Sequence, residues 1–182
     1  TDQILSSDDL KGDFKNFTKR QKNHKYSIAH FENKFYILTN LDAPNNRLME
    51  TSIFETNQSN WEEIIAHRNE EQILEMEVFS KHLVLNERID GLSVLRVIKR
   101  DFEDDYYINF GEESFSSWVS TNREFDTNIL RYVYTSMTIP YSTYDYDMDK
   151  KEKVLLKRQE VIGGYSDQEY YSERIYAQSR DC

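Results

Sequence analysis

The sequence predicts an all-β protein, a partial β-propeller of about three four-stranded antiparallel blades. Thirteen Tyr, ten Phe and two Trp stand against five Gly and two Pro, and aromatic side chains suit the pleated, half-buried surface of a strand. Short runs in which apolar and polar residues alternate recur along the chain, as strands with one buried face require. The pattern restarts at Tyr26, Leu74 and Phe115, at spacings of 48 and 41 residues. These spacings bracket the ~40–45 residues of a four-stranded propeller blade.

The first blade is predicted at residues 25–70. Its four strands are expected at residues 26–31, 35–38, 48–54 and 61–65. Turn-forming residues separate the first three of these strands, at residues 32–34 and at residues 42–47, which include Pro44.

A second blade is predicted at residues 71–112 and a third at residues 113–160. The strands of the second are expected at residues 74–79, 83–88, 92–98 and 106–110. Those of the third are expected at residues 115–120, 129–136, 141–146 and 153–157. Asp90-Gly91, between two strands of the second blade, is a strong signal for a tight hairpin turn.

A helix over residues 60–79 is the alternative for one stretch of this pattern. Asn60 could cap such a helix, and Glu63 stands three positions later, as in a capping box. Trp61 and Ile64 partly fit a helical face, but the same residues also fit a strand, a loop and a second strand.

Both ends resemble pieces of something larger. Residues 1–24 complete no blade, and we expect them to be the trailing edge of a preceding blade and a linker, with a possible strand at residues 13–17. Residues 161–182 are expected to form a hinge and the first strand toward a further domain. In this segment Gly163-Gly164 supplies backbone freedom, and residues 172–177 alternate like a new strand.

The composition narrows the class of protein. The chain has 182 residues, 38% of them hydrophobic, which is enough to bury a core. The net charge of -10 repels the phosphate backbone, so nucleic acid is not an expected partner. No apolar run approaches the ~20 residues that span a bilayer, so no membrane partner is expected. The single cysteine, Cys182, allows no disulfide within the chain, which suits the cytoplasm, although the periplasm stays open.

The sequence lacks the motifs typical of catalytic and metal-binding sites that we considered. It has no Gly-x-Ser-x-Gly nucleophile elbow, and its four histidines are scattered without metal-binding spacing. Asp145, Asp147 and Asp149 begin like a calcium loop. However, Lys150 and Leu156 stand where that loop needs Gly and Glu. We therefore expect no catalytic residue, no metal ligand and no cofactor in this chain.

Two charged clusters each have two interpretations. The basic run at residues 15–25 is either a solvated loop or a site for an anionic ligand. The acidic cluster at residues 101–105 is either a solvated loop or a surface that attracts basic peptides.

Several segments, in order along the chain, resemble one protein family. They are WEEII at residues 61–65, ER and GLSVLR within residues 87–96, YTSMTIP at residues 134–140, and YSER and RD within residues 171–181. With these segments the chain resembles oligopeptidase B, also called protease II, a branch of the prolyl oligopeptidase family of serine peptidases. Ser136-Met137-Thr138 followed by Pro140 favours this branch over the proline-cleaving one.

The resemblance implies a fold and an activity for the parent protein. In such enzymes a seven-bladed β-propeller caps an α/β-hydrolase domain, whose Ser-Asp-His triad cleaves short peptides after Lys or Arg. The chain would then be the later blades plus the first residues of the return to the catalytic domain. None of the matching segments contains a triad residue, so the chain alone is expected to be inactive. The family commonly has Gly where Cys182 stands.

The resemblance also implies partners and a role. The partners would be the missing α/β-hydrolase domain and, in the intact enzyme, short basic peptides. The propeller would gate the access of substrate by hinge motion. The candidate hinge residues are Gly163, Gly164, Tyr165, Tyr170, Glu173 and Arg174, with an ordinary ordered linker as the alternative.

Two other functions and one further property remain open at this point. The blades could form a stand-alone module that binds peptides or proteins, or a split domain that works only with a second chain. Since about three blades leave lateral faces uncovered, the chain is also expected to self-associate.

Overall fold

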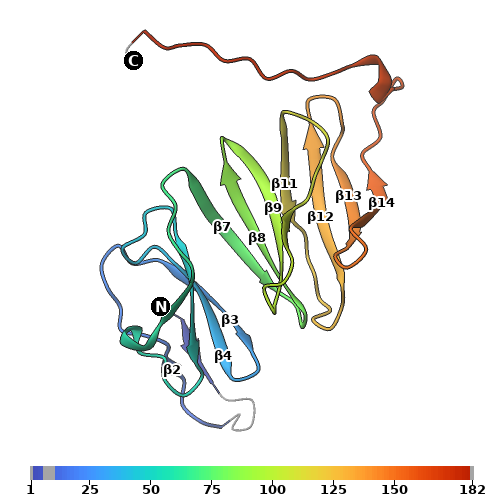
Figure 1. Cartoon of the computed structure of the whole chain (residues 1–182). Helices are drawn as coiled ribbons and strands as arrows, with labels where there is room; N and C mark the ends of the chain where they lie inside the picture. Colours follow the sequence, from blue (N-terminus) through green and yellow to red (C-terminus); the bar gives the residue numbers. More distant parts are fainter. Residues whose placement is uncertain (1, 6–10, 181–182) are drawn as a thin grey trace. The chain divides into compact units, whose positions relative to one another are not determined.

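A computed structural model describes residues 2–5 and 11–180 of the chain. The described residues form strands and two short 3-10 turns (Figure 1). The prediction of an all-β protein is therefore confirmed. The chain divides into two compact units, Thr1–Val78 and Phe79–Cys182. Among the described residues there is no helix of the length and apolar character needed to cross a membrane.

The first unit is built around a four-stranded antiparallel sheet whose strands pair in chain order. These strands are β3 (Tyr26–Phe31), β4 (Lys34–Thr39), β5 (Arg47–Ser52) and β6 (Glu62–Ile65). Before them, the short strands β1 (Gln3–Ile4) and β2 (Lys15–Asn16) pair with each other. The last strand of the unit is β7 (Glu71–Val78).

The helix alternative for residues 60–79 is wrong. The segment contains β6 and β7, and only the 3-10 turn η1 (Gln58–Asn60) precedes them. Asn57, rather than Asn60, caps that turn by accepting a hydrogen bond from the Ser59 amide at 3.2 Å. Trp61 is buried and donates its Nε1 hydrogen to the Thr56 carbonyl at 3.1 Å. Burial does not alternate strictly in β6, because Glu62 and Glu63 are both exposed and Ile64 and Ile65 are both half-buried.

An aromatic cluster forms the core of the first unit. Phe17 is only 1% exposed and meets the ring of Phe35 edge-on, with 5.1 Å between ring centroids. Trp61 lies 6.1 Å from Phe17 in the same cluster. Aromatic pairs of this kind add about 0.5–1.5 kcal/mol beyond the burial of their area. Phe17 thus anchors the segment before β3 to this unit.

The second unit contains two antiparallel meanders. The first comprises β8 (His82–Ile89), β9 (Leu92–Lys99) and β10 (Asp105–Tyr107). The second comprises β11 (Phe115–Val119), β12 (Ile129–Ser136), β13 (Ser142–Asp147) and β14 (Glu152–Arg158). β9 and β11 join the meanders in parallel, where Ser93 and Ser117 each donate a side-chain hydrogen bond to the other's carbonyl, at 2.6 and 2.7 Å.

The Asp90-Gly91 hairpin turn is confirmed. The two residues connect β8 to β9 with φ angles of 53° and 80°. Both central residues of a type I′ turn need positive φ, which Asp and Gly adopt at low cost. The turn projects from the sheet and becomes part of the site described below.

Stacked aromatic rings fill the core of the second unit. Tyr132 stacks on Tyr144 at 5.4 Å, and Phe110 stacks on Tyr134 at 5.0 Å. Leu130 lies beside them with no exposed surface. Burial of the Tyr132 and Tyr134 hydroxyl groups raises the pKa of both side chains, which keeps both phenols neutral.

The strand predicted at residues 172–177 does not form. After β14 the described chain contains only the 3-10 turn η2 (Asp167–Glu169). Backbone groups that are exposed can bond to water, so an extended segment joins a sheet only where a neighbouring strand pairs with it. No other strand lies beside these residues in the described part of the chain. Alternation alone was therefore insufficient here.

Candidate functional site at the chain exit

The chain after β14 contains a glycine pair in an exposed turn, closed by a hydrogen bond from the Gly164 amide to the Val161 carbonyl at 3.2 Å. The last bond to the sheet runs from the Gln159 amide to the Tyr141 carbonyl, at 2.8 Å. Gly163 and Gly164 then adopt φ angles of 97° and 91°, and a Cβ on either would meet nothing within 4 Å. Ile162 beside them is fully exposed. Because glycine alone adopts such φ angles readily, these residues can act as a pivot.

The chain makes contact with the second unit again directly after the glycines. Tyr165 is half-buried and stacks on Tyr170, with ring centroids 6.2 Å apart. Partial burial raises the pKa of Tyr165, and the carboxylates of Asp167 and Glu112 act in the same direction. Arg158, at the end of β14, reaches Asp167 at 3.4 Å. These contacts join residues 165–170 to the end of the sheet.

Arg174 connects the tail to two loops of the same unit. Its Nη1 lies 3.4 Å from Asp90 Oδ2, and its Nη2 donates a hydrogen bond to the carbonyl oxygen of Asp90. Its backbone amide donates to Glu113 Oε2 at 3.3 Å. The guanidinium also lies 5.1 Å from the ring centroid of Tyr176. Figure 1 shows the tail crossing the end of this sheet toward the β8–β9 turn.

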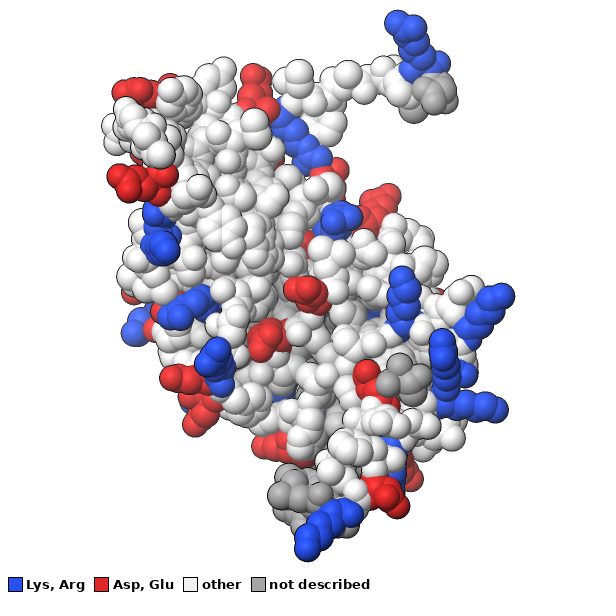
Figure 2. All heavy atoms as spheres, turned by 180° about the vertical axis from the view of Figure 1, so that it is seen from behind, with Lys and Arg blue, Asp and Glu red and all other residues white. Residues whose placement is uncertain are grey.

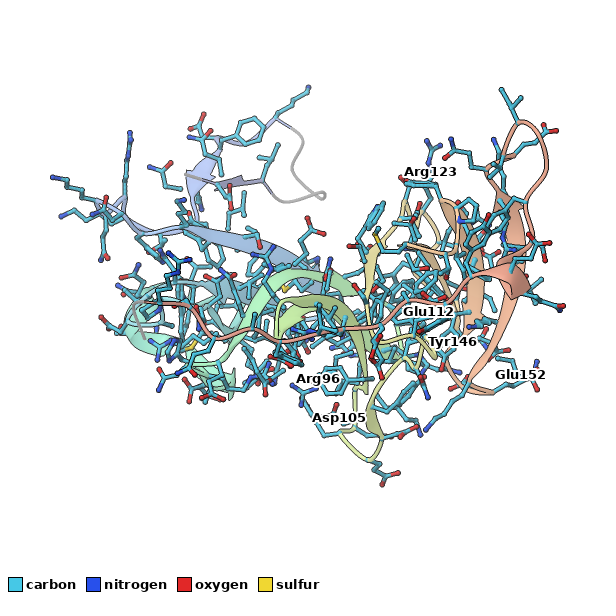
Figure 3. The ribbon with its side chains drawn as sticks, turned by 90° about the horizontal axis from the view of Figure 1, so that it is seen from above. Arg96, Asp105, Glu112, Arg123, Tyr146 and Glu152 are labelled. Atoms are coloured by element: carbon cyan, nitrogen blue, oxygen red, sulfur yellow. The ribbon has the colours of Figure 1, made fainter. Side chains whose placement is uncertain are left out.

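Glu112 belongs to the same end of the unit and is labelled in Figure 3. Its Oε1 accepts a hydrogen bond from the Thr138 hydroxyl at 2.8 Å. With Asp90 and Glu113 it gives this end an acidic character. Arg174 contacts two of these acidic residues, Asp90 and Glu113, whereas Glu112 Oε2 is enclosed.

The structure treats the six candidate hinge residues differently. Gly163 and Gly164 lie in a turn closed by a hydrogen bond from the Gly164 amide to the Val161 carbonyl at 3.2 Å. Tyr165 and Tyr170 stack on each other, and Arg174 is docked. Glu173 is exposed and has no ion pair among the described residues. Sequence reasoning missed Asp90 and Glu113 as partners of Arg174. They lie 84 and 61 residues away, and no local pattern signals the contact.

The three aspartates of the calcium-like segment do not converge. Asp145 pairs with Arg131 at 2.8 Å, and Asp149 approaches the buried His82 at 3.3 Å. Asp147 accepts hydrogen bonds from the backbone amides of Asp149 and Lys150. Across residues 2–5 and 11–180, no group of three or more His, Cys, Asp or Glu side chains could hold a metal ion.

Nearby cations pair with the acidic cluster at residues 101–105. Lys99 reaches Asp101 at 3.3 Å, and Lys151 reaches Asp104 at 2.9 Å. Arg96 binds Asp105 through two hydrogen bonds, of 2.7 and 2.5 Å. These hydrogen bonds raise the pKa of Arg96. The cluster is therefore a locally neutralised loop, and Figure 2 shows acidic and basic side chains interspersed on the face that it draws.

Comparison with protein families identifies this architecture. The model described as prolyl oligopeptidase, N-terminal β-propeller domain, matches residues 4–159. The chain belongs to this family. The partial propeller predicted from the sequence, and its resemblance to the prolyl oligopeptidase family, are thereby confirmed.

Relatives of the propeller carry different peptidase names. The chain is 35% identical over 171 residues to dipeptidyl aminopeptidase BI of Pseudoxanthomonas mexicana, which covers 93% of this chain and 23% of that protein. It is 26% identical over 155 residues to protease 2 of Moraxella lacunata, which covers 85% of this chain and 22% of that protein.

Solved structures of the family share the fold. Oligopeptidase B from Trypanosoma brucei, with covalently bound antipain, aligns with a TM-score of 0.86 at 26% identity, covering 98% of this chain and 27% of that one. Oligopeptidase B from Leishmania major aligns with a TM-score of 0.82 at 23% identity, covering 94% of this chain and 26% of that one. The propeller chain thus spans about a quarter of the length of the relatives that it matches.

Proposed function

We propose that this chain is the non-catalytic propeller part of a longer serine peptidase that hydrolyses short peptides after Lys or Arg. The proposal rests on the match of the propeller family model to residues 4–159. After these residues the chain leaves the sheet. The alignment with an oligopeptidase B that carries covalently bound antipain supports the choice of activity.

In this proposal the propeller gates the catalytic domain. A cap over an active site admits only short or unfolded peptides, and motion between the two domains lets substrate enter. Gly163 and Gly164 are the pivot of that motion, because their φ angles are positive and their surroundings are empty. The catalytic domain and the peptides are the partners of the propeller.

Release of dipeptides is a second candidate activity. The 35% identity to dipeptidyl aminopeptidase BI favours it. The two activities differ in a simple chemical requirement: an aminopeptidase needs a free α-amino group on its substrate, whereas an endopeptidase accepts a blocked one.

The test uses the longer protein encoded by the gene that contains this segment. We expect it to hydrolyse blocked chromogenic peptides that end in Arg or Lys, and to lose this activity on treatment with a serine-directed inhibitor. Turnover of unblocked dipeptidyl substrates alone would instead support the second candidate.

Residues 1–182 produced alone serve as the control. We expect this chain to hydrolyse neither kind of substrate. Turnover that survives purification and is lost on substitution of a residue in this chain would contradict a non-catalytic role. A gene that encodes no peptidase domain beyond these blades would favour the stand-alone binding module.

A further inference from the structure

We propose that residues 165–176 form an exit strap, a segment docked on the second unit and anchored by Arg174 to the β8–β9 turn. The exit strap follows the exposed turn at Gly163 and Gly164, where a Cβ on either residue would meet nothing within 4 Å, so the two parts of the exit have opposite roles. This inference deepens the proposed function, because it names the contact that must break before the chain beyond the propeller can swing away.

The first argument is the change in surroundings within a few residues. Ile162 is fully exposed, and the glycines after it have open space on their Cα atoms. Tyr165 is half-buried, its hydroxyl is enclosed, and the Ser172 hydroxyl farther on is enclosed as well. A uniformly loose tail would show no such alternation of free and enclosed groups.

The second argument is the chemistry of the anchor. A guanidinium offers several donors in a fixed plane, and Arg174 uses two of its nitrogens on the carboxylate and the carbonyl of Asp90. Only 27% of the Arg174 side chain is exposed, against 70% of the Asp90 side chain. The arginine is therefore the shielded partner, and its loss leaves the turn itself intact.

The third argument is the shape of the turn. Positive φ angles at Asp90 and Gly91 form the tight loop whose carbonyl at Asp90 accepts the guanidinium hydrogen bond. Arg174 Nη2 would lie 3.7 Å from a Cβ at Gly91, an ordinary van der Waals contact, so the guanidinium lies directly against the turn. The two residues that close the hairpin are therefore also the residues that Arg174 of the exit strap contacts.

The fourth argument is a second attachment made by the backbone. The Arg174 amide donates to Glu113, which lies in the loop between β10 and β11. The anchor residue therefore bridges two loops of the unit. Since both partners are acidic, the docked state is stabilised electrostatically and should weaken as salt rises.

The strap can be tested by limited chymotrypsin cleavage of the 182-residue chain. Tyr170, Tyr171 and Tyr176 are exposed aromatic sites within the strap, and a protease must lift such a segment from its surface before it cuts. We expect Arg174→Gln to speed cleavage in the strap by about 3- to 10-fold, the range for losing a partly shielded ion pair with its hydrogen bonds.

Two variants sharpen the comparison. Arg180→Gln is the matched control, because it removes the same charge from a tail arginine that has no partner among the described residues, and we expect the wild-type rate. Asp90→Asn keeps a residue that tolerates positive φ and keeps the carbonyl acceptor. We therefore expect Asp90→Asn to speed cleavage less than Arg174→Gln, and the double variant to behave like Arg174→Gln alone.

Salt provides a test without any substitution. Raising ionic strength from about 0.05 M to about 0.5 M screens exposed charges, so it should speed strap cleavage more in the wild type than in Arg174→Gln, which keeps only the Arg158–Asp167 ion pair among the described residues of the strap. Equal cleavage of the Arg174→Gln and Arg180→Gln chains, or no effect of salt on the wild type, would overturn the proposal. Peptidase assays on the longer protein are independent of this result, so the strap and the proposed function can fail separately.

Discussion

Strand β12 and the segment at residues 172–177 were both predicted as strands, but only β12 forms one. Both carry Ile and Tyr. β12 lies between β11 and β13 and pairs with both, whereas residues 172–177 have no neighbouring strand in the described structure. The difference shows that a strand-like sequence forms a strand only where neighbouring strands pair with its backbone and a core buries one of its faces.

The largest expected effect is on the free energy of unfolding, and it appears when one residue of β12 is compared with one residue of the tail. Leu130→Ala, in β12, removes a side chain with no exposed surface and should lower the free energy of unfolding by about 2–5 kcal/mol. Ile175→Ala removes a side chain that is 82% exposed and should change it by less than about 0.5 kcal/mol. Urea unfolding of the two variants measures the difference. Equal losses would mean that the tail is packed far better than its exposure indicates.

Self-association is the second expected effect, and it concerns the outer strand of the sheet. β14 lies at the end of the strand order and exposes Val154, Leu155 and Leu156, each by 44–63%. Contiguous exposed apolar surface favours association, so we expect a concentration-dependent mass in light scattering. The lysines at positions 153 and 157 oppose pairing of the strand edges, and association should therefore use the faces of the strand.

Lysine substitutions identify the face. Val154→Lys, Leu155→Lys and Leu156→Lys are made singly, because the register shift opposite Thr143 and Tyr144 interrupts the alternation of faces in β14. We expect one of these variants to weaken association about tenfold, a loss of about 1.4 kcal/mol. A sharp monomer at high concentration in the wild type would contradict the exposed face as an interface.

The smallest expected effect is a pH dependence confined to the body of the unit. Burial lowers the pKa of His82, Asp149 raises it in part, and Lys99 and Lys81 lower it further. The unfolded chain therefore binds a proton at higher pH than the folded one. His82 adds stability above the unfolded pKa of about 6.5, and this stability is lost as pH falls through the lowered folded pKa.

Urea unfolding between about pH 7 and pH 5 measures this loss. His82→Gln should reduce the slope of the unfolding free energy against pH, because it removes the group that takes up the proton. Asp149→Asn should steepen it, because the carboxylate that favours protonated His82 is removed. A slope that is identical in all three chains would rule out His82 as its source. The tail between residues 159 and 180 contains no histidine and should show no such dependence.

Most of the strands could be predicted because their signals are local. The alternation in residues 129–136 and the turn chemistry of Asp90-Gly91 depend only on neighbouring residues, and both appear in the structure as expected. Asn60 and Glu63 wrongly indicated a helix, because these two residue types at this spacing also occur in helix capping boxes. Trp61 decides for a strand only when the core around Phe17 is present to receive it.

The exit site was only half predictable. The Gly163-Gly164 pair stands out in a chain with five glycines, and its positive φ angles agree with the backbone freedom expected of it. Arg174 was selected as a charged residue able to pair, but the sequence offers many acidic residues as partners. The choice of Asp90 depends on the hairpin that projects this turn toward the tail.

By itself, the sequence determined the all-β class, the repeat of strands and turns, and membership of a peptidase propeller family. The first two follow from periodicity and turn residues, whose physical causes act over a few residues, and the third follows from segments that resemble the family. The tertiary structure decided which alternating segment became a strand and which arginine became an anchor. Both outcomes depend on groups 61 and 84 residues away or on missing neighbours. Only the folded backbone brings such groups within hydrogen-bonding distance.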